Sequence, residues 1–251
     1  MLGFNGGLLG KERRLTSGAL AATGLWLPNE QSVAKRAGNW PFGPTEVPNI
    51  GDPFLGGFFA GYISHTANGV ATHALIVAPA ATGASGTSYT ITTLRQWKTS
   101  TTTTAGTTSL FDGRANTDAI ITAGIALHPA VQFCTDLSIG GYTDWYMPAR
   151  FELAIAYANL KPSTTNNDTS TGINSYSVPA RAANYTSGSP AMTLVSAFNS
   201  TGAERFTTNA HWTSNELSAT GGSNLTFSNG ALGGVNKTVT QSVRAFRRVP
   251  V

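Results

Sequence analysis

The histidines, the single cysteine and two carboxylates are the residues of this sequence whose types could carry out chemistry. Cys134 is the only cysteine, so the chain can form neither an internal disulfide nor a four-cysteine zinc site. His65 and His73 flank an expected turn and can approach each other across a hairpin, but two histidines alone do not complete a zinc site. We therefore expect a buried, unreactive Cys134 and no bound metal or cofactor.

Asp144 and Glu152 are close enough in sequence to suggest the paired carboxylates of a glycosidase. The interpretation that we favour is structural: Asp144 accepts hydrogen bonds from backbone N–H groups in a turn, and Glu152 lies in the first turn of a helix. The motifs of nucleotide binding, serine hydrolysis and zinc-protease catalysis do not occur in the sequence. The sequence therefore predicts a protein that is not an enzyme.

A second group of residues has the chemistry of carbohydrate binding. Aromatic rings stack on sugars, amide and carboxylate side chains bind sugar hydroxyls, and Gly221 and Gly222 allow a close backbone approach. The expected binding surface comprises Asn209, His211, Trp212, Asn215, Glu216, Ser223 and Asn224. The alternatives are that these positions form an ordinary solvated loop, and that Trp212, like Trp145, packs in the core.

The composition limits the classes of protein to which the chain can belong. Only 11% of the 251 residues are charged, whereas 41% are hydrophobic and 28 are glycine. The chain has enough apolar residues to form a core, so disorder caused by low hydrophobicity is excluded. No apolar stretch is long enough to insert into a membrane. The net charge of +4 is not arranged as a dense basic stripe, so we expect no nucleic-acid partner.

The first 49 residues differ from the rest and are expected to form an extended arm with a proline-rich linker. Residues 28–38 have the pattern of one short helix, with Glu30 in its first turn and Gly38 after its last. Apolar side chains on such an arm have no local partner, so we expect the arm to dock on another chain. The candidate docking residues are Trp26, Leu27, Val33 and Trp40.

Residues 50–251 are expected to form one compact α+β domain whose terminal strands pair with each other. The residues from 161 to 190 lack periodicity and predict a long loop, which is typical of a functional region. Asn116 is expected to N-cap the first helix. Strands are predicted at 58–64, 74–78, 89–94, 211–214, 224–228 and 243–249, and helices at 116–126, 129–137 and 150–160.

Residues 140–153 read G-G-Y-T-D-W-Y-M-P-A-R-F-E-L and resemble the signature of the DUF1566 family, G-x-x-D-W-R-L-P-x-x-x-E-L. Two later segments resemble further family motifs in the same order: residues 212–216, near W-[ST]-S-[ST]-E, and residues 243–249, near V-R-x-V-R. Tyr146 stands where the family usually has arginine, and Phe151 where a polar residue is common. The signature residues are Gly141, Asp144, Trp145, Pro148 and Glu152.

The DUF1566 family is similar to C-type-lectin-like domains, so the resemblance implies that fold, with long irregular loops that bind partners. Residues 24–41 also resemble a short element of phage tail-fibre and virion-surface proteins. Together these resemblances imply a virion structural protein, in a tail fibre or baseplate, that presents a lectin-like domain to a glycan or protein of the host surface. The arm would then dock on other virion proteins, and a homo-oligomer is expected, with a trimer favoured.

The alternative is a purely structural virion module, such as a head decoration or a fibre connector, whose domain packs against its neighbours and binds no ligand.

Overall fold

The computed structural model describes residues 48–86 and 94–251. The predicted arm with its helix at 28–38 and its docking residues Trp26, Leu27, Val33 and Trp40 lies outside the described residues. So does almost all of the strand predicted at 89–94. These expectations stay predictions.

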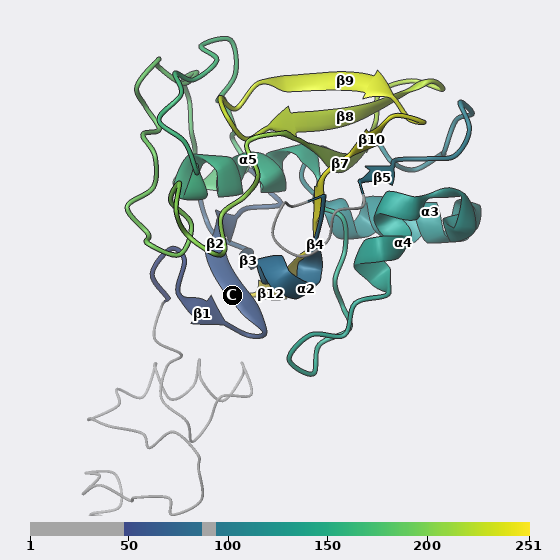
Figure 1. Cartoon of the computed structure of the whole chain (residues 1–251), viewed down its shortest axis with the longest axis horizontal. Coiled ribbons are helices and arrows are strands. Elements are labelled where there is room, and N and C mark those ends of the chain that lie inside the picture. The colour runs from purple at the N-terminus through teal and green to yellow at the C-terminus, as the bar shows by residue number, and fades with distance from the viewer. Residues whose placement is uncertain (1–47, 87–93) are drawn as a thin grey trace, which may run out of the picture. The chain divides into compact units, whose positions relative to one another are not determined.

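The larger sheet is antiparallel and contains both the first and the last strand of the described residues (Figure 1). Its path runs β1 (Pro53–Phe54), β2 (Gly57–Ile63), β3 (His73–Val77) and β12 (Phe246–Pro250), and β6 (Ser177–Val178) also pairs with β2. Val77 lies opposite Phe58 on one side and Phe246 on the other, which fixes the register. The sequence predicted that the terminal strands pair with each other. In the structure the last strand, β12, pairs with β3 instead of the first strand.

The second sheet has three antiparallel strands, and two short strand pairs connect distant parts of the chain. The sheet consists of β7 (Ala210–Glu216), β8 (Gly221–Thr226) and β9 (Leu232–Asn236). The short pairs are β4 (Ala84–Ser85) with β11 (Val243–Arg244), and β5 (Arg95–Gln96) with β10 (Thr240–Gln241).

Helix α5 (Arg150–Leu160) lies between the two sheets, on β2 from one side and on β7 and β8 from the other (Figure 1). Apolar side chains surround it, and Leu153, Ile155 and Leu160 join Leu225 of β8 in the larger hydrophobic core. A helix buried on nearly all sides needs apolar residues on more than one face, which explains its sequence. The other helices are α2 (Ala80–Gly83), α3 (Gly113–Gly124), the 3-10 turn η2 (Ile125–Leu127) and α4 (Pro129–Thr135).

The α+β class predicted from the sequence is confirmed, and so are the helix at 150–160 and the strands beginning near residues 58 and 74. The predicted N-cap of α3 is wrong. Asp112 caps this helix by accepting a hydrogen bond from the Ala115 N–H at 2.8 Å. Asn116 lies one turn further on, where its buried amide exchanges two hydrogen bonds with the backbone of Ser109 and donates a third to the Ser214 hydroxyl.

Candidate binding site

The structure buries most of the residues predicted to bind a glycan. The side chains of His211, Trp212, Asn215, Ser223 and Asn224 lie in the interior, and only Asn209 is exposed. The polar groups among them are used within the fold: Asn215 accepts a hydrogen bond from the Arg150 N–H and donates one to the Ser109 carbonyl. Because a buried side chain cannot contact a surface ligand, the structure does not support this binding surface.

Glu216, the remaining residue of that predicted surface, belongs to a buried ion pair. Its Oε1 lies 2.5 Å from the Nζ of Lys237, whose side chain is fully buried, and its Oε2 accepts the Thr104 N–H at 2.8 Å. Lys98 lies beside them and donates to the carbonyls of Thr102 and Thr103. These contacts attach the threonine-rich loop that follows β5 to β7 and to the residue after β9.

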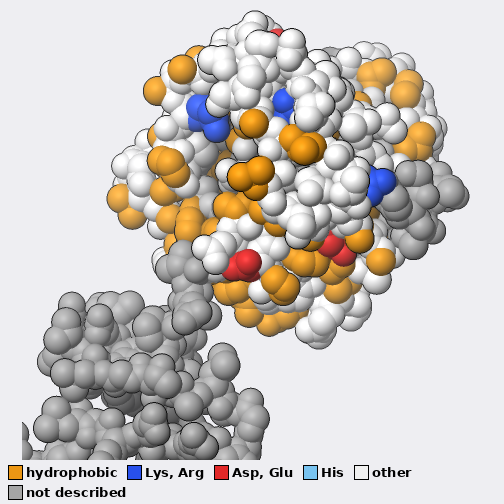
Figure 2. All heavy atoms as spheres, turned by 60° about the vertical axis from the view of Figure 1, so that its left-hand side comes forward, with side chains coloured by type: hydrophobic (Ala, Val, Ile, Leu, Met, Phe, Trp, Pro, Cys, Tyr) orange, Lys and Arg blue, Asp and Glu red, His pale blue; other side chains and the backbone are white. Residues whose placement is uncertain are grey.

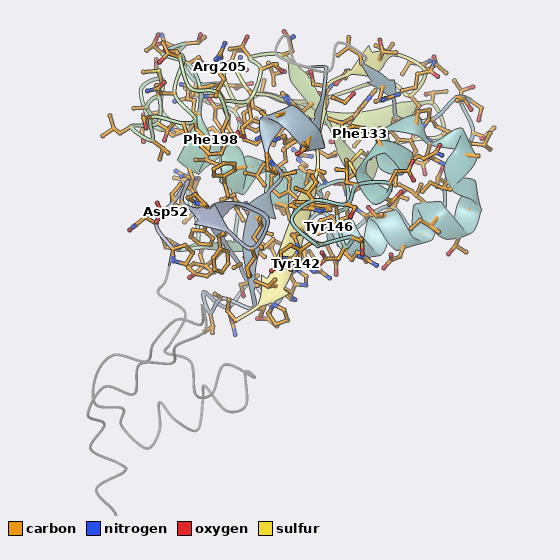
Figure 3. All side chains as sticks on the ribbon, turned by 60° about the horizontal axis from the view of Figure 1, so that its bottom comes forward. Asp52, Phe133, Tyr142, Tyr146, Phe198 and Arg205 are labelled. Carbon is orange, nitrogen blue, oxygen red and sulfur yellow. The ribbon has the colours of Figure 1, made fainter. Side chains whose placement is uncertain are left out.

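The signature segment has a structural role. Trp145 is buried, as predicted, and its indole N–H donates to the Tyr142 carbonyl at 3.0 Å. Asp144 was predicted to accept hydrogen bonds from backbone N–H groups. In the structure its Oδ1 instead accepts a hydrogen bond from Nε of Arg247 at 2.7 Å. The Arg247 guanidinium also lies 3.8 Å from the centre of the Tyr142 ring, so the segment is attached to the last strand (Figure 3).

Glu152 is the most deeply buried carboxylate of the signature, and the fold uses its oxygens fully. Oε1 accepts the Tyr146 hydroxyl at 2.6 Å, while Oε2 accepts the N–H groups of Ala149 and Gly113. A Cβ at Gly113 would lie 2.4 Å from Oε2, so this approach requires glycine. Burial raises the pKa of Glu152 to about 7. A fully buried group with three internal donors has no access to substrate, so we assign Glu152 a structural role.

The predicted approach of His65 and His73 is confirmed, with ring centroids 4.5 Å apart. Arg248 contacts His65 and forms a two-point ion pair with Asp112, the cap of α3. A guanidinium repels a cation at this position. Within residues 48–86 and 94–251, no group of three or more histidine, cysteine or acidic side chains is placed to hold a metal ion. Cys134 is buried as predicted, and burial raises the pKa of its thiol.

The histidines predict a loss of stability in acid. Burial is the main cause that lowers the pKa of His211 to about 3 and that of His65 to about 4, and it also lowers the pKa values of His73 and His128. The folded state therefore binds fewer protons than the unfolded state below pH ~6.5, the ordinary histidine value, so stability rises with pH up to about that point. Glu152 has the opposite effect on stability between pH 4.5, its ordinary pKa, and about pH 7. In this range the folded state binds the Glu152 proton more tightly than the unfolded state, so stability falls as the pH rises.

Since four histidines act against one carboxyl, we expect the urea midpoint at pH 4.5 to lie below that at pH 7. His211→Phe, which keeps an aromatic ring beside Phe206 and Phe227, should make this pH dependence shallower. If the variant and the parent lose stability equally between pH 7 and pH 4.5, His211 does not contribute to the acid sensitivity.

The long predicted loop is confirmed, and its first half is held by a buried lysine and a buried asparagine. Lys161 donates through Nζ to the carbonyls of Thr165 and Pro190 and to the Asn167 side-chain oxygen. The Asn167 amide donates to three backbone carbonyls from residues 186–190, and the Tyr157 hydroxyl of α5 donates to its oxygen. This polar cluster joins both ends of the loop to α5 and gives an irregular segment a defined conformation.

We expect Lys161→Met to lower the free energy of unfolding by about 2–3 kcal/mol, because it removes the donor from two buried acceptors and one part-buried acceptor. Chemical unfolding followed by tryptophan fluorescence measures the change. Arg114→Met on the exposed face of α3 is the control; it breaks only the exposed ion pair with Asp118 and should change stability by less than about 1 kcal/mol. Equal losses in the two variants would show that Lys161 does not hold the loop.

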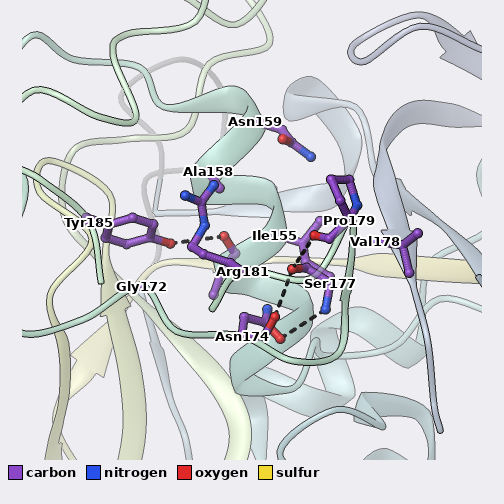
Figure 4. A pocket seen from close by; sticks show the side chains of 11 residues that line it. Ile155, Ala158, Asn159, Gly172, Asn174, Ser177, Val178, Pro179, Arg181 and Tyr185 are labelled. Carbon is purple, nitrogen blue, oxygen red and sulfur yellow. Dashed lines mark hydrogen bonds between the residues drawn. The ribbon is translucent and has the colours of Figure 1, made fainter. Parts of the chain in front are cut away.

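A pocket of about 100 Å³ lies where this loop passes over α5 (Figure 4). Ala154, Ile155, Ala158 and Asn159 of α5 form one wall, and the other lining residues come from the loop and β6: Gly172, Asn174, Ser177, Val178, Pro179, Arg181 and Tyr185. Gly172 has φ +125°, and a Cβ there would lie 2.4 Å from the Tyr185 nitrogen, so glycine is required for the loop to close over the helix.

Arg181 is the charged residue of this pocket. Its backbone is fixed by two hydrogen bonds with Asn174, and its guanidinium lies 5.1 Å from the centre of the Tyr185 ring. Among the described residues it forms no ion pair, in contrast to Arg244, Arg247 and Arg248. The pocket thus combines one guanidinium without an internal counter-ion, an aromatic ring and polar side chains on an otherwise apolar wall, which suits a small anionic or hydroxylated group.

The pocket residues were not predicted from the sequence. The only signal for the pocket was the length of the aperiodic loop that supplies Arg181 and Tyr185. Neither residue belongs to a motif, and their approach to α5 depends on the anchoring by Lys161 and Asn167, which side-chain type alone does not show.

The comparisons with known proteins do not assign the chain to a family. No family description matches it, and no curated protein does. Among solved structures, a fimbrial protein from Bacteroides ovatus matches with a TM-score of 0.34 and 18% sequence identity, over 86% of this chain and 41% of that protein. The chain therefore spans less than half the length of this neighbour, and a similarity at this level carries no argument about fold or function.

Proposed function

We propose that this chain is a virion structural protein whose domain at residues 50–251 recognises a host surface through the loop at 161–190. The observation that carries the proposal is the pocket on this loop. It holds a guanidinium that contacts the Tyr185 ring but has no counter-ion among the described residues, in a loop conformation stabilised by buried polar contacts. A binding function explains why a long irregular segment is held so firmly next to α5.

The character of the surface supports a role in contacts with other molecules. On the face shown in Figure 2, most of the surface is backbone and uncharged non-hydrophobic side chains, with apolar side chains between them and only a few charged ones. Such a surface suits hydroxyl-rich ligands and protein neighbours better than nucleic acid. None of the helices in the described residues is long and apolar enough to cross a membrane.

The finer parts of the proposal come from the sequence resemblances. They are a C-type-lectin-like topology, an arm at residues 1–49 that docks on other virion proteins, and a homotrimer. Display in several copies would raise the avidity of a small pocket. We also propose a non-enzymatic role, because the buried carboxylates of the signature and of β7 are occupied by internal donors.

A second candidate is the purely structural virion module, and the exposed apolar side chains favour it. Leu194 is 97% exposed and Val70 64%. Side chains of this kind are suited to packing against a neighbouring subunit.

The adsorption of assembled particles to host cells separates the two candidates. Particles carrying Arg181→Gln should assemble normally and adsorb at least tenfold more slowly than the parent, while the control Arg114→Gln, which removes a charge on α3, should leave adsorption unchanged. Normal assembly and unchanged adsorption with Arg181→Gln would favour the structural module.

A further inference from the structure

We propose that the pocket between α5 and the 161–190 loop binds the carboxylate of an acidic sugar, with Arg181 as the group that selects it. This inference rests on the proposed recognition function and specifies the ligand class. Its starting point is the charge of the pocket: among the eleven lining residues Arg181 is the sole charged side chain. An anionic ligand would supply the counter-charge that the described residues do not provide.

The single guanidinium favours a carboxylate over a phosphate. A guanidinium presents parallel N–H groups that match the two oxygens of a carboxylate, and one positive charge balances one negative charge. A phosphate monoester carries up to two negative charges. Among the lining residues there is no second cation to balance the additional charge.

The neighbouring polar groups favour a hydroxylated ligand. Asn159 lines the pocket and donates through Nδ2 to the Ala60 carbonyl at 2.8 Å, and its second N–H and its side-chain oxygen form no further hydrogen bond with the described residues. The Ser177 hydroxyl has one proton, which lies within reach of the Asn174 and Pro179 carbonyls, so its oxygen can accept a hydrogen bond from a ligand hydroxyl. Both groups lie in the same pocket as the guanidinium and would contact hydroxyls next to the carboxylate.

The size of the pocket fits a terminal group of a larger glycan. Its volume of about 100 Å³ is below the range of about 300–1,000 Å³ typical of sites that enclose a drug-sized ligand. The carboxylate and its adjacent carbon would enter, and the rest of the sugar would lie along the surface. Affinity for one sugar residue is then weak, and display in several copies is needed for attachment.

Chemical-shift titrations of the full chain test the proposal directly. Methyl β-D-glucuronide is the acidic probe, and methyl β-D-glucoside is its neutral match. Propionate tests the carboxylate without hydroxyls, inorganic phosphate tests a divalent anion, and N-acetyl-alanyl-alanine tests a peptide carboxylate. We expect the glucuronide to shift the amide signals of residues 172–185 and to bind at least tenfold more tightly than each of the other four probes.

Arg181→Gln should abolish the preference for glucuronide over glucoside while leaving the remaining amide signals in place, and Arg114→Gln should retain it. The sugar assignment is overturned if the peptide or phosphate binds as tightly as the glucuronide, or if Arg181→Gln leaves the preference unchanged. If no acidic probe binds but particle adsorption still depends on Arg181, the ligand class is wrong while the recognition function stands. If no acidic probe binds and adsorption does not depend on Arg181, the proposed ligand class and the proposed recognition function are both wrong.

Discussion

Glu216→Ala is expected to lower the free energy of unfolding by about 3–5 kcal/mol, the cost of removing one partner from a buried ion pair. The substitution leaves the fully buried ammonium of Lys237 without its carboxylate, and it leaves the Thr104 N–H without its acceptor. Urea unfolding at pH 7 measures the loss. If Glu216 were a glycan-binding residue at the surface, as the sequence predicted, Glu216→Ala would change the free energy of unfolding very little.

Two variants make this result specific to the buried pair. Asp118→Ala breaks the exposed ion pair with Arg114 on α3 and should cost less than about 1 kcal/mol. Lys237→Met combined with Glu216→Ala removes both charges and should recover part of the stability lost in the single variant. A loss below about 1 kcal/mol in Glu216→Ala would contradict the buried ion pair.

Trp145→Ala should also cost about 3–5 kcal/mol, the range for emptying a large aromatic site in a core. Trp145 is 1% exposed, packs in the core cluster with Ile76 and Met147, and donates its indole N–H to the Tyr142 carbonyl. Thermal and chemical unfolding should agree on the loss. The control, Leu194→Ala at an exposed position, should change stability by less than about 0.5 kcal/mol. A similarly small effect of Trp145→Ala would mean that the ring is not part of the core.

The sequence predicted those elements whose local pattern matches their environment. Helix α5 was predicted with its correct bounds because its apolar residues, the preceding proline and the glutamate in its first turn all indicate the same segment. The cap of α3 was misplaced because Asp112 and Asn116 are both good N-cap residues. Tertiary contacts decide between them: Asn116 is used by Ser109 and Ser214.

The predicted binding residues were misplaced for a physical reason that composition cannot show. Polar residues of β7 and β8 were expected at the surface, but in the structure they satisfy buried groups that come from distant parts of the chain, such as Lys237 and the backbone of Ser109. The chain has few charged side chains, and several of them form internal ion pairs. The charged side chain that lines the pocket without a counter-ion among the described residues is Arg181, in a loop that has no sequence motif.

A cryo-electron-microscopy map of the assembled particle tests whether this chain is a virion protein that exposes the 161–190 loop. We expect density for this chain on the virion surface, with residues 161–190 and the Arg181 pocket open to solvent and the N-terminal arm against neighbouring virion proteins. Density that covers this loop with an adjacent subunit in every copy, or particles that lack the chain altogether, would contradict it.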